Sequence, residues 1–145
     1  MRYSEITNEA VAKLPLPALP KVGETPFWVH PLRPISARNK LGDWSKGGCF
    51  AFADALATVY KGRRWSVCSL DEDGGYPVEH AMVRIGTVFY DFRGVWLDPL
   101  KSIKSKRKLY LKPANDPSVF WFEDESLDDE DFATLKHVLR TGSRP

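Results

Sequence analysis

The sequence predicts an α+β fold in which one central helix packs on an antiparallel sheet, with further helices at the periphery. Three segments lead to this prediction. Residues 49–60 are apolar on nearly every side, which is typical of a buried helix. Residues 80–94 alternate as a β-hairpin around a Gly-Thr turn. Residues 126–140 carry the cap, the charge distribution and the apolar stripe of an amphipathic helix.

The composition is that of one domain, spanning residues 1–145. With 145 residues, of which 43% are hydrophobic and 12% aromatic, the chain can bury a substantial core. Its net charge of only +2 makes nucleic acid an unlikely partner. No apolar run approaches the roughly 18 residues of a membrane-spanning helix, and no secretory signal is visible. We therefore expect a cytoplasmic protein with no membrane partner, and export as an effector without a cleaved signal stays open.

The two cysteines, Cys49 and Cys68, lie far apart and lack CxxC spacing. A disulfide framework and a zinc site built from thiolates are therefore not expected. No phosphate-binding glycine loop, HExxH or EF-hand pattern appears, so we expect no metal and no cofactor. Cys68 lies in the middle of an apolar strand pattern and is expected to belong to the core.

The chain divides into three parts. Residues 1–14 are expected to form a short helix, residues 15–40 a proline-rich extended arm, and residues 41–145 the core of the domain. Proline lacks a backbone donor and disfavours the helical region for the residue before it, so the arm should be extended. Phe27 and Trp28 within the arm indicate that it packs along the domain.

The elements that follow are delimited by turn and capping residues. The helix over 49–60 should stop at Lys61-Gly62-Arg63, with Gly62 as the terminating residue. Strands are expected at 65–70, 109–111 and 119–122, with a turn over 71–75. The last helix should be capped by Ser126 and end before Gly142.

The register of the hairpin follows from its turn. Gly86-Thr87 fits a two-residue type II′ turn, which pairs Ile85 with Val88. In this register His80 and Asp91 lie diagonally on one face, where backbones are roughly 7–8 Å apart and the side chains can hydrogen-bond. We expect the Cys49 helix to pack on that face.

Cys49, His80 and Asp91 are the candidate catalytic residues. Cys49 follows Gly47-Gly48 at a helix start, where unpaired N–H groups and the helix dipole favour a thiolate. His80 would take the thiol proton and return it to a leaving group, and Asp91 would orient the imidazole. The backbone N–H of Cys49 would form half of an oxyanion hole. Gly48, Ser45 and Trp44 are weaker candidates for oxyanion or substrate binding, as is Asn39 for the second oxyanion donor.

Residues 47–94, with Gly-Gly-Cys-Phe-Ala-Phe-Ala-Asp-Ala-Leu and then His-Ala-Met-Val-Arg-Ile-Gly-Thr-Val-Phe-Tyr-Asp-Phe-Arg-Gly, resemble the papain-like cysteine hydrolase superfamily. The resemblance is to small bacterial and phage members of the transglutaminase-like, NlpC/P60-like or arylamine-acetyltransferase-like branches. It implies a nucleophile on the central helix, a base on the next strand and an orienting residue on the strand after, which are Cys49, His80 and Asp91. Papain-type peptidases have Gln six residues before the nucleophile; this chain has Asp43 there.

Two functions follow from these patterns. The first is a cysteine-dependent hydrolase or acyl transferase that acts on amide bonds of a protein or peptide through a thioester intermediate. Trp44, Phe50, Tyr76 and Trp96 would then wall a groove for the peptide. The second is a non-catalytic interaction or inhibitor module on the same fold. It would bind a partner through residues 101–108, where five of eight side chains are cationic.

Overall fold

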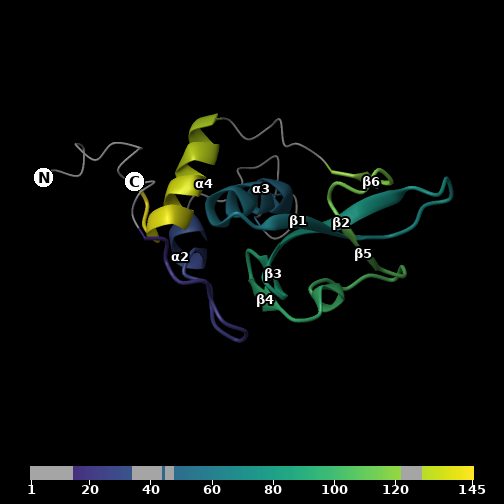
Figure 1. Ribbon diagram of the computed structural model, residues 1–145, viewed down its shortest axis with the longest axis horizontal. Helices are drawn as coiled ribbons and strands as arrows, with labels where there is room; N and C mark the ends of the chain where they lie inside the picture. The colour runs from purple at the N-terminus through teal and green to yellow at the C-terminus, as the bar shows by residue number, and fades with distance from the viewer. Residues whose placement is uncertain (1–14, 34–43, 45–47, 122–128) are drawn as a thin grey trace, which may run out of the picture.

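The computed structural model describes residues 15–33, 44, 48–121 and 129–145, and within them it combines helices with a mainly antiparallel sheet (Figure 1). The predicted α+β class is confirmed at this level. In chain order the elements are α2 (Val29–Leu32), α3 (Cys49–Tyr60), β1 (Arg63–Cys68), β2 (Tyr76–Ile85), β3 (Val88–Asp91), β4 (Gly94–Trp96), the 3-10 turn η3 (Pro99–Lys101), β5 (Tyr110–Pro113), β6 (Val119–Phe120) and α4 (Asp129–Thr141).

The sheet has the strand order β4-β3-β2-β1-β5, and each neighbouring pair in this series is antiparallel. The short β6 lies off this path and pairs with the start of β2 in parallel. β2 is ten residues long and lies in the middle of the sheet, where it pairs with β1, β3 and β6.

The hairpin of β2 and β3 has the predicted register. Ile85 pairs with Val88 and Val83 with Tyr90. Gly86 adopts a φ of 65°, the positive value that a type II′ turn requires at its first central residue. The turn chemistry therefore fixes which residues of the two strands face one another.

The helix α3 begins and ends where the sequence predicted and lies between α4 and the sheet (Figure 1). Its residues Phe52, Ala55 and Leu56 are almost completely buried in a cluster that includes Ala81 and Val83 of β2. A helix enclosed on two sides needs apolar residues around most of its circumference, which is the pattern seen in the sequence.

The predicted role of Gly62 as the residue that terminates α3 is wrong. Lys61 takes the left-handed conformation at the helix end, with a φ of 55°, and donates its N–H to the carbonyl of Ala57. Gly62 is instead required by packing, because a Cβ atom there would lie 2.6 Å from Cγ1 of Val83 and 2.8 Å from Cγ1 of Ile85.

Gly62→Ala is therefore expected to lower the free energy of unfolding by about 1–3 kcal/mol, since the added methyl group overpacks the contact with β2. Gly94→Ala is the matched control, because a Cβ atom at Gly94 would meet nothing within 4 Å. Urea unfolding of the three proteins measures the difference. Equal midpoints for the two variants would contradict the packing argument.

The proline-rich arm is only partly extended, so this prediction is corrected. Residues 15–21 have no regular structure, but α2 forms a single helical turn that contains Pro31. Pro31 is tolerated because it lies in the first turn, where a backbone N–H has no partner within the helix. The expected packing of the arm is confirmed, since Trp28 is fully buried and its indole N–H donates to the carbonyl of Phe92 at 2.8 Å.

The remaining boundaries differ slightly from those predicted. β5 begins one residue later than expected, and β6 contains only two residues. α4 ends as predicted, with Gly142 at a φ of 76° and its N–H bonded to the carbonyl of Val138. The predicted helix over 1–14 and the cap Ser126 lie outside the described residues. None of the helices in the described ranges is both long and apolar enough to cross a membrane.

Candidate active site

His80 and Asp91 form a buried hydrogen-bonded pair across the β2–β3 hairpin. Nε2 of His80 lies 2.9 Å from Oδ2 of Asp91, and the two residues are only 1% and 2% exposed. This diagonal contact is the one that the hairpin register predicted. Away from solvent, a hydrogen bond to a carboxylate fixes both the orientation of an imidazole and which of its nitrogens carries a proton.

The other carboxylate oxygen of Asp91 organises the turn into β4. Oδ1 accepts the backbone N–H groups of Arg93 and Gly94 at 2.9 and 3.0 Å. A guanidinium nitrogen of Arg93 lies 4.0 Å from Oδ2 and also donates to the carbonyl of Ser102. Asp91 thus both begins a turn and pairs with His80, and the two functions use different oxygens.

Arg93, Ser102 and Trp28 are residues around the site that sequence reasoning missed. Trp28 fixes the backbone of Phe92, next to Asp91, and Ser102 is buried against Met82. The Asp-Phe-Arg-Gly stretch was a signal for the two backbone bonds to Asp91, because Asp commonly accepts N–H groups from residues that follow it. The contacts from Trp28 and Ser102 depend on tertiary structure and had no signal in the sequence.

Cys49 is the first residue of α3 and lies against His80. Gly48 forms the N-cap, and its carbonyl accepts the N–H of Phe52 at 3.0 Å. The N–H of Cys49 is one of the first-turn donors that have no partner within a helix. The thiol is a free cysteine, 3% exposed, and it lies close enough to His80 to raise the pKa of the imidazole. Because Nε2 of His80 is engaged by Asp91, Nδ1 is the ring nitrogen that remains for proton exchange with the thiol.

The pKa of His80 reflects these two neighbours. Burial lowers it, but the hydrogen bond to Asp91 and the contact with Cys49 outweigh burial and raise the pKa from 6.5 to about 9. The imidazole is therefore protonated at neutral pH.

The prediction that α3 packs on the sheet face that carries His80 and Asp91 needs a correction. α3 packs on Ala81 and Val83, whereas Met82, which alternates with them, belongs to a second cluster with Val67 and Phe89. Strict alternation along β2 would put His80 and Met82 on the same face, so it does not hold for this pair if His80 is to reach the helix side. The β1–β2 register shifts directly beside His80, and such irregularities re-aim side chains.

The weaker candidates have mixed outcomes. Gly48 is buried at the N-cap of α3, next to the thiol. Trp44 is buried, and its indole N–H is directed at the carbonyl of Leu32 at 3.4 Å, so this donor already has an acceptor. Ser45, Asn39 and Asp43 lie outside the described residues. The backbone N–H of Cys49 is thus the donor that the described structure offers for an oxyanion.

Cys68 lies in the core, as the sequence predicted. Cys68 is fully buried, with its thiol 3.4 Å from the carbonyl of Tyr110, and burial raises its pKa. His30 is exposed, while burial followed by the charge of Arg140 lowers the pKa of His137. Within the described ranges, no group of three or more His, Cys, Asp or Glu side chains is arranged to hold a metal ion.

Comparisons with known proteins add no relative: no family model, no curated protein and no solved structure matches the chain. The case for a function therefore depends on the chain's own sequence and on the geometry of Cys49, His80 and Asp91.

The charge of His80 predicts how Cys49 discriminates between two alkylating agents. Below a pH of about 9 the imidazole is positive and attracts the anion iodoacetate, and above it the imidazole is neutral. The ratio of the alkylation rates with iodoacetate and with neutral iodoacetamide should therefore be highest near neutrality and fall as the pH rises through about 9. Alkylation reactions that are quenched at set times and quantified by peptide mass spectrometry measure this ratio. A flat ratio at Cys49 would show that no positive group titrates next to the thiol.

Proposed function

We propose that the protein is a cysteine-dependent hydrolase or acyl transferase that acts on amide bonds of a protein or peptide. Cys49 is the nucleophile, His80 the general acid and base, and Asp91 the orienting residue. One observation carries the proposal: a thiol at a helix start lies beside a buried imidazole whose Nε2 is held by a carboxylate at 2.9 Å. This is the nucleophile–base–orienter arrangement that activates a thiol.

The reaction proceeds in two steps. The Cys49 thiolate attacks the carbonyl carbon of the amide, and the resulting oxyanion is stabilised by the backbone N–H of Cys49. His80 then gives its proton to the departing amine, the carbon–nitrogen bond breaks, and a thioester remains on Cys49. Water or an amine next attacks the thioester while the neutral His80 takes its proton. The carbon–sulfur bond then breaks and Cys49 leaves as the thiolate, which restores the starting pair of thiolate and protonated imidazole.

The resemblance to papain-like hydrolases fits this proposal. In those enzymes the nucleophile is on a central helix, with the base and the orienting residue on successive strands. Here α3, β2 and β3 carry Cys49, His80 and Asp91 in the same order. We propose on this basis that the fold is a papain-like core, and that the protein works in the cytoplasm, where its two free thiols stay reduced.

An amide is the substrate that this chemistry suits. A thiolate with an imidazole acid acts on acyl carbons, and the pattern of residues supplies no phosphate loop or dinucleotide turn. Of the four aromatic residues predicted to wall a peptide groove, Phe50 lies closest to the nucleophile in sequence and packs its ring edge-on against Trp121. Cleavage, deamidation and acyl transfer share the same first step, and the proposal includes all three.

Alkylation of Cys49 relative to Cys68 tests whether the thiol is activated. Both cysteines are buried and free, but only Cys49 contacts an imidazole. Near neutral pH, iodoacetamide should modify Cys49 at least tenfold faster than Cys68, as measured by peptide mass spectrometry of the native protein. Equal and slow modification of the two thiols would remove the proposed nucleophile.

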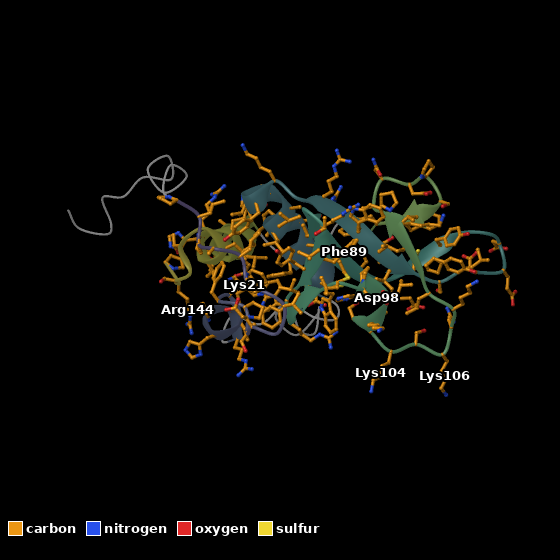
Figure 2. The ribbon with its side chains drawn as sticks, turned by 60° about the horizontal axis from the view of Figure 1, so that its bottom comes forward. Lys21, Phe89, Asp98, Lys104, Lys106 and Arg144 are labelled. Carbon is orange, nitrogen blue, oxygen red and sulfur yellow. The ribbon has the colours of Figure 1, made fainter. Side chains whose placement is uncertain are left out.

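A non-catalytic interaction module is the second candidate, and one observation favours it. Cys49, His80 and Asp91 are all nearly inaccessible, whereas the cations of residues 101–108 lie at the surface, and Lys104 and Lys106 extend away from the domain (Figure 2). Incubation of a broad protein pool with wild type and with Cys49→Ala distinguishes the two functions. Cleavage products, deamidated peptides or adducts that depend on Cys49 support the enzyme; their complete absence supports the module.

A further inference from the structure

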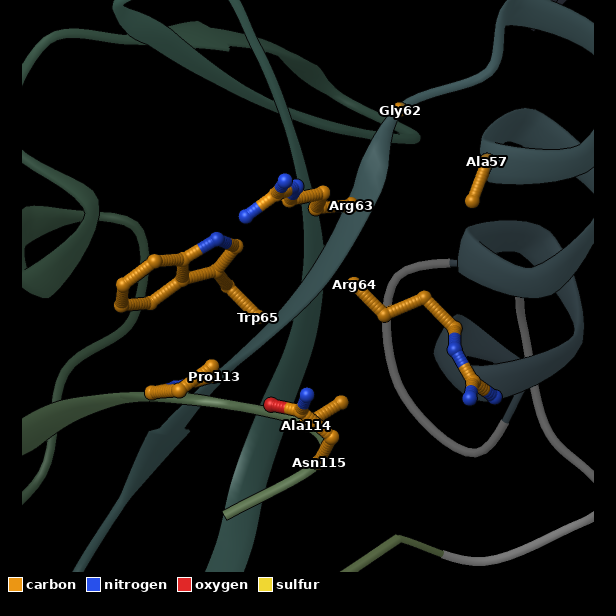
Figure 3. A pocket seen from close by; sticks show the side chains of 8 residues that line it. All are labelled: Ala57, Gly62, Arg63, Arg64, Trp65, Pro113, Ala114 and Asn115. Carbon is orange, nitrogen blue, oxygen red and sulfur yellow. The ribbon is translucent and has the colours of Figure 1, made fainter.

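Two adjoining pockets lie where α3 ends and β1 begins. The larger, of about 580 Å³, extends from Ala57 to Pro113 and Asn115 (Figure 3). The smaller, of about 300 Å³, extends toward Arg84 and Gly86. Both are lined by Gly62, Arg63 and Trp65, so they form one continuous depression along the start of β1. α3 is 12 residues long, which places this depression about 18 Å from Cys49 at the other end of the helix.

The depression is strongly cationic. Lys61, Arg63 and Arg84 line it together with Arg64, and no Asp or Glu is among the described lining residues of either pocket. Arg64 is neutralised by Asp54 at 2.8 Å. Arg63 is exposed and has no acidic partner in the described part of the chain, and the Nε of Arg84 donates only to the carbonyl of Gly86. Three positive charges are therefore left to meet a ligand.

A second observation points to a ligand at the same place. The indole N–H of Trp65 is buried and has no hydrogen-bond partner among the described residues. Figure 3 shows the nitrogen edge of Trp65 turned toward the guanidinium of Arg63, its neighbour on the same face of β1. Trp96 and Trp121 also carry buried indole N–H groups without a partner in the described ranges. The indication at Trp65 therefore comes from the position of its N–H beside Arg63, where two N–H donors suit a planar oxyanion.

We propose that this depression binds an acidic peptide segment of a partner protein, with one carboxylate held between Arg63 and Trp65 and further carboxylates on Lys61 and Arg84. The arginine fork matches a carboxylate, and two joined pockets exceed the size of a single small anion. The peptide would bind independently of the thiol chemistry at Cys49.

Other polyanions fit less well. Phosphate sites built on glycine use free backbone N–H groups, but the N–H of Gly62 donates to the carbonyl of Ala57 at 3.1 Å. Single-stranded nucleic acids stack their bases on open aromatic rings. The ring of Trp65 is instead covered by the guanidinium of Arg84 at 5.8 Å and meets Phe89 edge-on at 5.9 Å.

Fluorescence anisotropy of a labelled hexaglutamate peptide tests the proposal at low ionic strength. All proteins carry Cys49→Ala, so binding is measured without thiol chemistry and its failure leaves the proposed enzyme untouched. Arg63→Ala should weaken binding about tenfold or more, and Trp65→Phe, which removes the indole N–H together with one of the two fused rings, should weaken it to a lesser extent. Lys104→Ala is the control, because it removes one exposed charge from the separate basic run.

Binding that is weakened by Arg63→Ala and Trp65→Phe but not by Lys104→Ala supports the site. Absence of binding by the folded protein, or equal weakening by Arg63→Ala and Lys104→Ala, overturns it. Pyrophosphate and a single-stranded oligonucleotide are the competitors. If either displaces the peptide while binding more tightly itself, the depression recognises a phosphate ligand and the peptide assignment is wrong.

Discussion

Asp91→Asn is expected to lower the rate of the amide-directed reaction roughly 10⁴-fold while leaving the fold intact. The asparagine oxygen can keep the two bonds from the backbone N–H groups of Arg93 and Gly94. Its NH₂ group would then face Nε2 of His80, where Oδ2 now accepts. Two donors cannot share that contact, so Nε2 must become an acceptor and the proton must move to Nδ1. A neutral His80 that carries its proton on the side of Cys49 cannot accept another one.

The same change should lower the pKa of His80. In the native protein, burial lowers this pKa, and the hydrogen bonds to Asp91 and Cys49 raise it to about 9. Without the carboxylate, fewer contacts stabilise the charged imidazole, while burial still disfavours it. The pKa of His80 should therefore fall toward or below its ordinary 6.5. Titration of the labelled imidazole by NMR measures this shift without a known substrate.

Asp98→Asn is the matched control for this prediction. The carboxylate of Asp98 also accepts a backbone N–H, from Leu100, but it contacts no histidine. It should therefore leave both the reaction rate and the titration of His80 unchanged. Full activity in Asp91→Asn would remove Asp91 from the site, whatever its effect on the turn.

The parts of the fold that the sequence predicted are those governed by local rules. α3 has the predicted bounds because its apolar residues recur around the whole helix and its start follows two glycines. The β2–β3 register was predictable because a positive φ at Gly86 allows only a narrow set of turns. From that register the contact between His80 and Asp91 followed directly, and the 2.9 Å distance confirms it.

The parts that were mispredicted depend on contacts between distant segments. The turn of α2 forms although Pro31 argued for an extended chain, because Trp28, Val29 and Leu32 are buried in the core around α3. Gly62 looked like a helix terminator, but its place is set by the side chains of Val83 and Ile85 across the sheet. The pairing of β6 with β2 in parallel had no sequence signal either, since two residues carry no periodicity.

The candidate site was likewise predictable where local rules decide and unpredictable where distant segments meet. Sequence order and turn geometry brought His80 to Asp91, but the approach of Cys49 depends on where α3 meets the sheet. There the alternation rule alone failed, because Met82 packs away from α3 while His80 contacts the thiol. The register shift next to His80 is a structural irregularity that the alternating pattern of the sequence does not reveal. Irregularities of this kind are common beside active sites, where they direct a side chain that regular pairing would misplace.

His80→Ala is expected to have the largest effect on stability, lowering the free energy of unfolding by about 3–5 kcal/mol. The variant leaves Oδ2 of Asp91 buried without its partner, and it opens a cavity in place of a fully buried ring. Because domains of this size are stable by only about 5–15 kcal/mol, such a loss lowers the urea midpoint markedly. The alkylation of Cys49 should also slow toward that of Cys68.

His80→Gln separates the chemical role of His80 from its structural one. The glutamine amide can donate an N–H to Asp91 and refill much of the cavity, so its unfolding midpoint should lie closer to wild type than that of His80→Ala. It cannot become positive or take a proton, so the rapid alkylation of Cys49 near neutral pH should be lost in both variants. If His80→Gln is stable and Cys49 remains as reactive as in wild type, the imidazole supports the fold but does not activate the thiol. If His80→Gln is more stable than His80→Ala and both variants lose the rapid alkylation of Cys49, then His80 has two separate roles. Its bond to Asp91 supports the fold, and its ability to carry a charge and a proton supports the reaction.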